Sequence, residues 1–494
     1  MKLNKNKWLI LLLAGVMVGC ESDDDTDDLI EELVEYTSGT ADFTHYVAIG
    51  NSLTAGFTDG ALFMAGQQNS LANILAQQFA LAGGGDFTQP LMSGNTGGLL
   101  LGGTPIQEPR LYFNGSGPAR LAATPTTEVT SKLTGPFNNM GVPGAKSFHL
   151  AAPGYGNVAG VATGQANPYF ARFASSANAT VIGDAIAQEP TFFSLWIGNN
   201  DVLSYATSGG DGVYQKDNLD PSTYGGNDIT NPNVFAQVYS GLVAGLVASG
   251  ADGVVANIPN VTTIPYFTTV PHNPVPLDAA TAGALGQGFL QYNGGLQAAL
   301  AGGMITEEEA AERTITFTEG RNAVVIVDEN LTNLSALGIP SYRQATSNDL
   351  IVLTASSFIG TTVGDNAQMI NGVTVPLGDK WVLTPTEQAD VLEATTAFNQ
   401  TIKSVAEANG LAFVDVNAIM NEIATAANGV PFDEYFMNAR LVFGGAFSLD
   451  GVHPTGRGYA FIANKFIEAI NATYGSNLPP VRAAGYTTLY PASM

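Results

Sequence analysis

Four short apolar runs constrain the fold of this chain more than any other feature. They lie at 46–49, 191–197, 253–258 and 411–415, and longer segments with helical character separate them. Short runs that are apolar at nearly every position suit strands buried on both faces, as in a parallel sheet. Strands that alternate with helices predict that such a sheet is covered on both sides. We therefore expect an α/β fold of three layers, α/β/α, with a parallel central sheet.

The segments around these runs predict further elements. Apolar residues recur at helical spacing in 67–82, and Pro232 suits the first position of a helix that ends near Ser249. Other expected helices lie near 278–301, 306–313, 386–409 and 457–473, and strand-like runs lie at 314–318, 323–328 and 349–354.

Composition narrows the class of protein. Among 494 residues there are 43 acidic and 18 basic side chains, which gives a formal net charge of −25. Binding nucleic acid needs clustered Lys and Arg, so no nucleic-acid partner is expected. Hydrophobic residues make up 45% of the chain, which is enough for a sizeable core. The single cysteine excludes an internal disulfide and a CxxC-type metal site.

The first residues have the pattern of a bacterial export signal. Lys2, Lys5 and Lys7 precede an apolar run from Trp8 to Val18. That run is about half of the roughly 20 residues that span a bilayer, which predicts a signal peptide and not a transmembrane helix.

A lipid attachment site is expected at the end of this signal. Met17-Val18-Gly19-Cys20 resembles a bacterial lipobox, which implies cleavage before Cys20 and lipid attachment to it. The acidic stretch 21–28 is similar to the export tract of Bacteroidetes-type surface lipoproteins, although a plain spacer would look alike. We expect an outer-membrane lipoprotein of the bacterial cell envelope, held to the membrane through Cys20.

The rest of the chain is expected to form one enlarged domain. No internal repeat and no second independently folding unit is apparent in the sequence. The stretch 83–135, rich in Gly, Pro and Thr, predicts long loops. We expect a lipoprotein signal peptide at 1–19, an acidic tether at 20–40, one domain at 41–475, insertions near 83–135, 203–231 and 275–380, and a C-terminal tail at 476–494.

Two segments carry residues suited to nucleophilic chemistry. Ser52 follows the first strand, and active sites of open α/β sheets lie at the carboxyl ends of strands. His453 stands just before the last helix, three residues after Asp450. A histidine is the usual general base for a serine hydroxyl, and a carboxylate fixes its tautomer. Taken singly, each has a plainer reading, as a helix N-cap or a surface residue.

Two further segments could stabilise an oxyanion. Asn139-Met140-Gly141-Val142-Pro143-Gly144 offers a glycine N–H, and Gly198-Asn199-Asn200-Asp201 offers an asparagine amide. Both groups can donate hydrogen bonds to the negative oxygen that develops during acyl transfer. Alone, both segments are also ordinary turn sequences.

In this chain order the four segments resemble the SGNH/GDSL hydrolase superfamily. The matching blocks are GNSL at 50–53, NMGVPG at 139–144, GNND at 198–201 and DGVH at 450–453. The resemblance spans about 44–473 and implies a flavodoxin-like three-layer fold. The stretch 256–265 is also similar to the lipase-like GDSL branch.

The resemblance implies a role for each matched residue. Ser52 would be the nucleophile, His453 the general base and Asp450 its orienting partner. The Ser52 N–H, the Gly144 N–H and the Asn200 side chain would form the oxyanion hole. No metal and no cofactor is implied. One departure is Asn51, which replaces the Asp of the GDSL block but can make the same type of turn contact.

Three functions fit these residues. The first is a lipid-anchored serine esterase or lipase, which the apolar residues Leu62, Phe63 and Met64 slightly favour. The second is a deacetylase of acetylated glycans with the same triad. The third is a catalytically inert surface-binding lipoprotein, which the presence of all the matched residues disfavours.

Other candidates for metal or acid–base chemistry are weaker. His45, His149 and His272 lack ligand-like spacing. The acidic loop 211–228 lacks the spacing of an EF-hand, so a solvated loop is favoured over a Ca²⁺ site.

Overall fold

A five-stranded parallel sheet forms the centre of the protein. The computed structural model describes residues 35–364 and 366–494. The strand order is β17-β8-β7-β1-β6, and every neighbouring pair is parallel. Numbered along the chain, the order is 2-1-3-4-5, the flavodoxin-like arrangement. The predicted α/β sheet is therefore confirmed, with strands β1 (Tyr46–Gly50), β6 (Asn139–Gly141), β7 (Phe192–Trp196), β8 (Asp252–Ala256) and β17 (Ala412–Val414).

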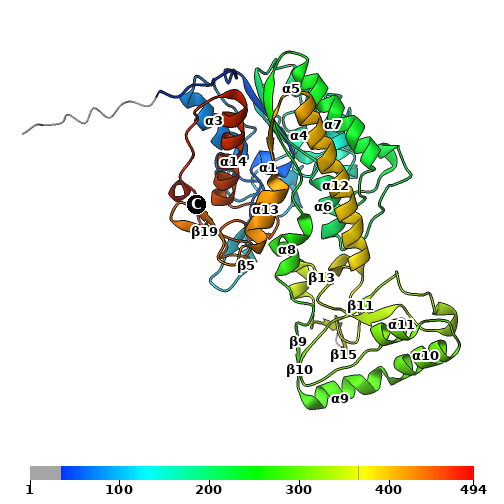
Figure 1. Cartoon of the computed structure of the whole chain (residues 1–494). Coiled ribbons are helices and arrows are strands. Elements are labelled where there is room, and N and C mark those ends of the chain that lie inside the picture. Colours follow the sequence, from blue (N-terminus) through cyan, green and yellow to red (C-terminus); the bar gives the residue numbers. More distant parts are fainter. Residues whose placement is uncertain (1–34, 365) are drawn as a thin grey trace, which may run out of the picture. The chain divides into compact units, whose positions relative to one another are not determined.

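Helices cover both faces of this sheet (Figure 1). Helices α3 (Leu71–Leu81) and α14 (Gly456–Tyr474) pack together on one face. Helices α5 (Val181–Ile186), α7 (Pro232–Val247) and α12 (Pro385–Ala408) lie on the other. The three layers expected from the sequence are present.

The apolar runs form strands because they can be buried on both faces. Every residue of β1 and β7 is buried. Pro232 is the first residue of α7, as predicted, and the Asn231 side chain caps that helix by accepting from the N–H groups of Asn233 and Val234. The core therefore lies between the sheet and its two helical layers.

Shorter elements connect and extend these layers. The other helices are α1 (Ser52–Ala55), α2 (Met64–Gln68), α4 (Pro168–Ala171), α6 (Asn200–Thr207), α8 (Pro265–Thr268), α9 (Ala279–Gly288), α10 (Leu290–Ala301), α11 (Glu307–Arg313) and α13 (Val416–Thr425). The other strands form antiparallel pairs: β2 (Leu99–Leu101) with β3 (Thr104–Gln107), β4 (Leu111–Phe113) with β5 (Pro118–Arg120), β9 (Val275–Leu277) with β10 (Gly320–Asn322), β11 (Val325–Val327) with β12 (Tyr342–Gln344), β13 (Leu350–Ile351) with β16 (Val382–Leu383), β14 (Thr362–Val363) with β15 (Asn366–Ile370), and β18 (Val430–Phe432) with β19 (Tyr435–Met437).

Three details differ from the sequence-based expectations. The stretch 83–135 contains two hairpins, β2–β3 and β4–β5, and not loops alone. The helix expected near 278–301 is broken at Phe289, next to Gly288, a residue with low helix propensity. The strand expected at 314–318 does not form, and there the Ile315 N–H donates to the side chain of Asn293 at 3.0 Å instead of to a strand.

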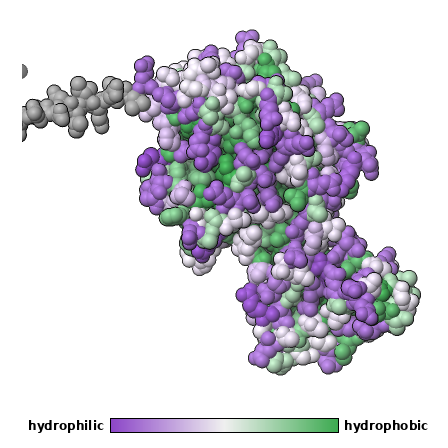
Figure 2. Space-filling model, in the orientation of Figure 1, coloured by the Kyte–Doolittle hydropathy of each residue, from purple (hydrophilic) through white to green (hydrophobic). Residues whose placement is uncertain are grey.

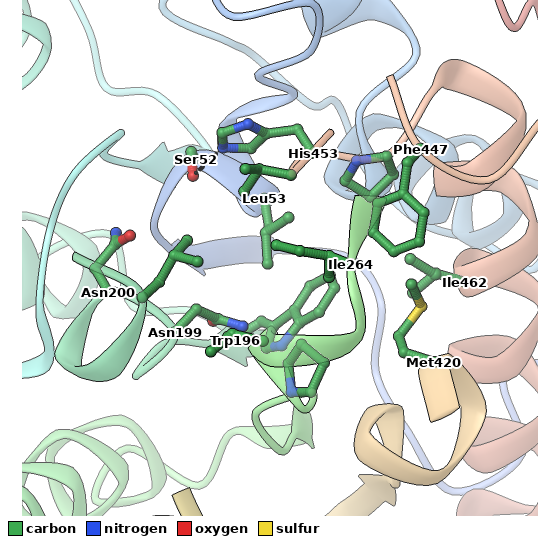
Figure 3. A pocket seen from close by; sticks show the side chains of 15 residues that line it. Ser52, Leu53, Trp196, Asn199, Asn200, Ile264, Met420, Phe447, His453 and Ile462 are labelled. Atoms are coloured by element: carbon green, nitrogen blue, oxygen red, sulfur yellow. Dashed lines mark hydrogen bonds between the residues drawn. The ribbon is translucent and has the colours of Figure 1, made fainter. Parts of the chain in front are cut away.

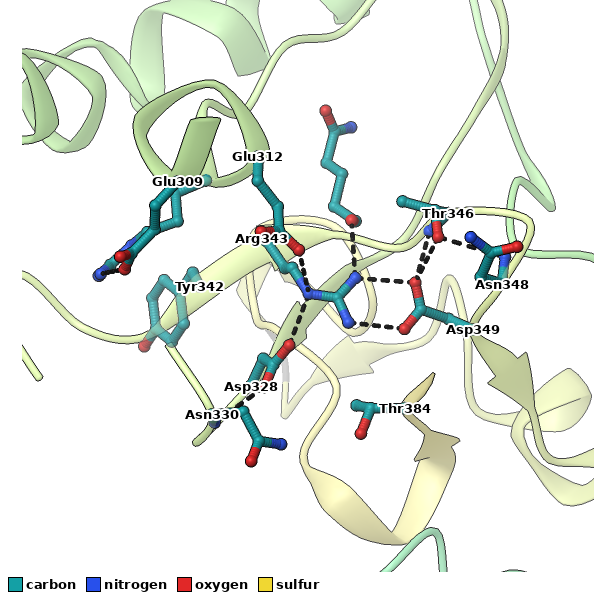
Figure 4. Close-up of polar contacts among 12 residues, drawn as sticks. Glu309, Glu312, Asp328, Asn330, Tyr342, Arg343, Thr346, Asn348, Asp349 and Thr384 are labelled. Carbon is teal, nitrogen blue, oxygen red and sulfur yellow. Dashed lines mark hydrogen bonds and ion pairs between the residues drawn. The ribbon is translucent and has the colours of Figure 1, made fainter. Parts of the chain in front are cut away.

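A buried ion cluster holds part of the 275–380 insertion together (Figure 4). The Arg343 guanidinium donates to both carboxylate oxygens of Asp349 at 2.6 and 2.7 Å. Its Nε donates to Asp328 at 2.7 Å and lies 3.5 Å from Glu312. The cluster joins the β11–β12 hairpin to the segment before β13.

The described residues include the C-terminal end of the chain but not residues 1–34. The predictions for 1–19, for Cys20 and for the tether up to residue 34 lie outside the described residues. At the other end, the segment after α14 packs onto the domain, because buried Arg110 donates to the carbonyl oxygens of Tyr490 and Pro491. No helix within 35–364 and 366–494 combines the length and apolar character that a bilayer crossing needs.

The visible surface is mainly hydrophilic (Figure 2). Apolar residues appear on that face in separate small areas among polar ones. Scattered apolar residues of this kind are usual for a folded domain and need no partner to cover them.

Candidate active site

Ser52 lies at the turn between β1 and α1. Asn51 caps α1, because its Oδ1 accepts a hydrogen bond from the Leu53 N–H at 3.0 Å. Its Nδ2 donates to Asn199 Oδ1 at 3.1 Å, which links this turn to the loop after β7. The turn contact expected of Asn51 is confirmed, and its amide adds a bond that an ionised Asp could not donate.

Ser52, His453 and Asp450 form a continuous hydrogen-bonded relay. Ser52 Oγ lies 2.9 Å from His453 Nε2, and His453 Nδ1 lies 2.8 Å from Asp450 Oδ2. With the Nδ1 proton directed at Asp450, Nε2 is free to accept the hydroxyl proton of Ser52. The fold thus brings Ser52 and His453, which are 401 positions apart in the sequence, into hydrogen-bond contact.

Asp450 is held as a carboxylate. Burial alone would raise its pKa, but the charge and hydrogen bond of His453, together with the backbone N–H groups of His453 and Val452, outweigh burial and set the pKa to about 2. Ser448 Oγ and the Gly60 N–H also donate to Asp450, at 3.0 and 2.8 Å. A carboxylate with this many donors keeps its negative charge over the whole range in which histidine titrates.

Gly451 allows Asp450 and His453 to face one another. Its φ is +73°, in the left-handed region that favours glycine. A Cβ at this position would lie 2.9 Å from the backbone nitrogen of Tyr266. Both the turn and the close approach of another loop therefore require glycine. On the other side of the site, the Phe57 ring lies 4.6 Å from the His453 ring.

The expected oxyanion donors come from three neighbouring strand ends. Strand β1 lies between β6 and β7, so the turns that carry Ser52, Gly144 and Asn200 follow adjacent strands. Asn200 Nδ2 donates to the Ala145 carbonyl at 2.9 Å, which places its amide against the loop that carries Gly144. Neither the Ser52 N–H nor the Gly144 N–H has a hydrogen-bond acceptor within the described residues.

The topology explains this location. In a 2-1-3-4-5 sheet the order in which successive strands are added reverses between β1 and β7, and ligands bind beside the carboxyl ends of the strands at that point. Ser52 follows β1 and Asn200 follows β7.

A residue that the sequence did not single out fixes the loop that carries Gly144. Asp201, which is fully buried in α6, accepts from the Ser147 N–H at 2.8 Å and from the Ser147 hydroxyl at 2.7 Å. It therefore ties the segment after Gly144 to the helix that carries Asn200. Its place beside Asn200 in GNND was the available signal, but its partner could not be read from the sequence.

An apolar pocket opens beside the relay (Figure 3). Ser52, His453 and Asn200 supply polar groups to its lining, and its cavity volume is about 40 Å³. Most of its remaining wall is apolar and comes from separate parts of the chain, including Leu53, Trp196, Ile264, Met420, Phe447 and Ile462.

The residues expected to favour acyl chains are not in this wall. Leu62 packs in a small separate apolar cluster with Ala55 and Met92. Phe63 is fully buried with its ring edge-on to Tyr490. The expectation drawn from Leu62, Phe63 and Met64 is therefore wrong in its residues, because none of the three lines the pocket.

The other histidines do not contact Ser52. His149 stacks on Tyr155, and its Nδ1 accepts from the Lys146 N–H. Burial, with a smaller effect of the Lys146 charge, lowers the pKa of His149 to about 4. In the part of the chain that the structure describes, no group of three or more His, Cys, Asp or Glu side chains is placed to hold a metal ion.

Comparisons with known proteins give few matches. No protein-family model and no curated protein matches the chain. Among solved structures, it is similar to variants of Axe2, described as an acetyl-xylooligosaccharide esterase or acetylxylan esterase from Geobacillus stearothermophilus. For two of these the identity is 11%, the TM-scores are 0.32 and 0.31, and the match covers 87% and 88% of this chain and 96% of the other. For a third the identity is 11%, the TM-score is 0.32, and the match covers 91% of this chain and 100% of the other.

Proposed function

We propose that this chain is a serine hydrolase of carboxylic esters and belongs to the SGNH/GDSL superfamily. The relay from Ser52 Oγ through His453 to Asp450, with links of 2.9 and 2.8 Å, is the observation that carries the proposal. A hydroxyl, an imidazole and a carboxylate in this order are the components of nucleophilic acyl transfer.

The residues act in two half-reactions. His453 takes the proton of Ser52 as the hydroxyl oxygen attacks the ester carbonyl carbon, and the carbonyl oxygen becomes an oxyanion. The imidazolium then protonates the leaving alcohol, which leaves an acyl group on Ser52. Water attacks this acyl-enzyme with His453 again as the base, the imidazolium returns that proton to Ser52 Oγ, and the acid is released.

Two N–H groups without acceptors and one neighbouring amide suit the oxyanion. The N–H groups of Ser52 and Gly144 and the amide of Asn200 belong to adjacent turns, and hydrogen bonds to the developing charge lower the barrier. Asp450 keeps its charge near the imidazolium throughout the cycle.

The pocket supports an ester with an apolar acyl group. A wall formed by residues such as Trp196, Met420 and Phe447 offers little to the hydroxyl groups of a sugar but would bury an alkyl chain. This observation favours the esterase or lipase activity over the deacetylation of glycans.

The central test is the removal of the Ser52 hydroxyl. Ser52→Ala should abolish hydrolysis of p-nitrophenyl butyrate and labelling by a fluorophosphonate probe, whereas Ser357→Ala, at an exposed serine, should retain both. Full activity in Ser52→Ala would overturn the proposal. A wild-type chain that neither hydrolyses esters nor reacts with the probe would instead support the inert binding protein.

A series of acyl lengths tests the substrate. Rates on p-nitrophenyl esters from acetate to laurate, compared with release of acetate from acetylated xylan, should favour the alkyl esters. Met420→Trp should shift the optimum to shorter chains by filling the pocket, while the matched change Met369→Trp, at an exposed methionine, should not. Preferred release of acetate from xylan would favour the deacetylase.

The cellular location is a separate part of the proposal. The lipobox and the acidic stretch support a lipoprotein anchored through Cys20 in the outer membrane of the bacterial envelope. In cells fed labelled palmitate, the wild-type chain should incorporate label and fractionate with the outer membrane, and Cys20→Ser should do neither. Incorporation in Cys20→Ser would contradict the anchor.

A further inference from the structure

A tight turn shortly after Ser52 contacts the loop that carries His453. Thr58 and Ala61 exchange backbone hydrogen bonds of 3.1 and 3.2 Å around Asp59 and Gly60. The φ values of these central residues are +51° and +70°, as a type I′ turn requires, and Asp-Gly is a favoured sequence for it. The Thr58 hydroxyl also donates to the Pro454 carbonyl at 3.0 Å.

This turn holds both oxygens of Asp450. The Asp59 N–H donates to Ser448 Oγ at 2.9 Å, and that hydroxyl donates to Asp450 Oδ1 at 3.0 Å. The N–H of Gly60 donates directly to Asp450 Oδ2, the oxygen that faces His453, at 2.8 Å. The orientation of Asp450 therefore depends on the geometry of the turn.

The side chain of Asp59 is buried beside this network. It is 1% exposed, its Oδ1 accepts from the Leu449 N–H at 3.0 Å, and its Oδ2 has no hydrogen-bond partner among the described residues. Burial, more than the bond from Leu449 or the charges of Asp450 and Arg110, determines its ionisation and raises its pKa to about 7. Because the buried Oδ2 has no hydrogen-bond partner in the described part of the chain, the negative charge of this carboxyl is disfavoured further, which also raises its pKa.

Other charged groups near the turn also affect the ionisation of Asp59. Asp450 opposes ionisation of Asp59, and Arg110 favours it. The charged and titratable side chains around the turn and its partner loop are Asp450, His453, Arg110, Arg120, Tyr459 and Tyr490.

We propose that Asp59 is a positioning residue of this site, which fixes Asp450 through the turn and, when ionised, adds a second negative charge beside the Asp450–His453 pair. The inference rests on the proposed ester hydrolysis. A second negative charge near His453 stabilises the imidazolium that forms as Ser52 attacks, so the ionised form of Asp59 gives the faster enzyme.

The test is Asp59→Asn, which is almost isosteric. Its amide oxygen can still accept from the Leu449 N–H, and Asn tolerates positive φ, so the turn should persist. In the wild type, kcat/KM for p-nitrophenyl butyrate should rise in an additional step near neutral pH. Asp59→Asn should lack that step, with a loss of about three- to tenfold at pH 8.5, little loss at pH 5.5 and an unchanged KM.

Ser448→Ala separates geometry from charge. It removes the hydroxyl between the Asp59 N–H and Asp450 but leaves the Asp59 carboxyl, so it should lower kcat/KM by a similar factor at every pH. Profiles of Asp59→Asn and wild type that differ only by a constant factor would overturn the charge effect and the proposal with it.

An NMR titration does not need ester hydrolysis, so it tests the role of Asp59 independently of the proposed function. The chain has four histidines, so ¹³C-labelled histidine gives few NMR signals, and loss of one in His453→Asn assigns the site. The His453 ring signals should show an extra pH-dependent step near neutrality in wild type that is absent in Asp59→Asn, even if Ser52→Ala shows that no ester is hydrolysed. Identical titration curves would overturn the proposal.

Discussion

Two regions of this protein hold carboxylates against a basic side chain, and they differ in which polar groups they leave without a hydrogen-bond partner. Around Arg343, the nitrogens of the guanidinium are taken by Asp328, Asp349 and the Gln344 carbonyl. At the candidate active site, Asp450 is equally well bonded, but the Ser52 and Gly144 N–H groups have no acceptor in the described residues.

This difference in unpaired groups distinguishes a region that stabilises the fold from one that can bind a ligand. Buried polar groups normally find partners, so the unpaired N–H of Ser52, which is buried and lines the pocket, marks a place where a ligand can accept a hydrogen bond. Every nitrogen of the Arg343 guanidinium has a hydrogen-bond acceptor. The Arg343 cluster can hold the insertion together, whereas the site around Ser52 can also accept an oxyanion.

The largest expected effect tests this contrast at Asp450. An Asn there would place an amide opposite both the His453 Nδ1 and the Gly60 N–H, which forces the histidine into the wrong tautomer. Asp450→Asn should lower kcat by about 10⁴, the loss known for the corresponding change in another serine hydrolase. Steady-state kinetics would show it, with Asp278→Asn, at an exposed helix cap, as the control. A loss below tenfold would contradict the role of Asp450.

The opposite behaviour is expected of the ion cluster. Asp349→Asn leaves Arg343 without its bidentate partner, and breaking a buried pair costs about 3–5 kcal/mol of unfolding free energy. Urea denaturation should show this destabilisation, while kcat on p-nitrophenyl butyrate at 20 °C should stay within twofold of wild type. A large loss of activity in folded protein would mean that the two regions are coupled.

Much of this arrangement could be predicted from the sequence. Apolar runs that need burial on both faces predicted the parallel sheet, and the carboxyl ends of its strands were the expected place for Ser52 and Asn200. That these two residues lie close together was implied by the family resemblance. Local spacing with an intervening glycine predicted that Asp450 reaches His453. These inferences depend only on chain order and on residues close in sequence.

The contacts between distant loops could not be predicted. Asp59 and Ser448 are 389 positions apart, and nothing in either segment shows which hydroxyl the turn contacts. The pocket wall could not be predicted for the same reason. Met420 and Phe447 come from different elements, and from the sequence alone any apolar residue could equally have belonged to the core. Leu62 shows that closeness to Ser52 in the sequence does not predict a position in the pocket wall.

A smaller effect should follow from removing one of the proposed oxyanion donors. Asn200→Ala deletes the amide that contacts the Gly144 loop through Ala145. By comparison with another serine hydrolase, kcat should fall by about 10²–10³ with little change in KM, because the bond forms mainly in the transition state. Thr207→Ala, at the other end of the same helix, is the matched control. Loss confined to KM would instead indicate a role in substrate binding.

The smallest effect concerns stability and sharpens the contrast with the ion cluster. Because the folded protein raises the pKa of Asp59 from 3.8 to about 7, the unfolded chain ionises first as pH rises. Folding then becomes less favourable between about pH 4 and pH 7, and the full cost persists above pH 7. Asp59→Asn removes that cost, so its Tm should match wild type near pH 4 and exceed it by about 2–5 °C at pH 8. A Tm difference that is the same at both pH values would show that the Asp59 carboxyl does not resist ionisation. If the gap opens as expected, the carboxyl of this turn lowers stability at the pH where its charge assists His453, which is the reverse of what the Arg343 cluster does for the insertion.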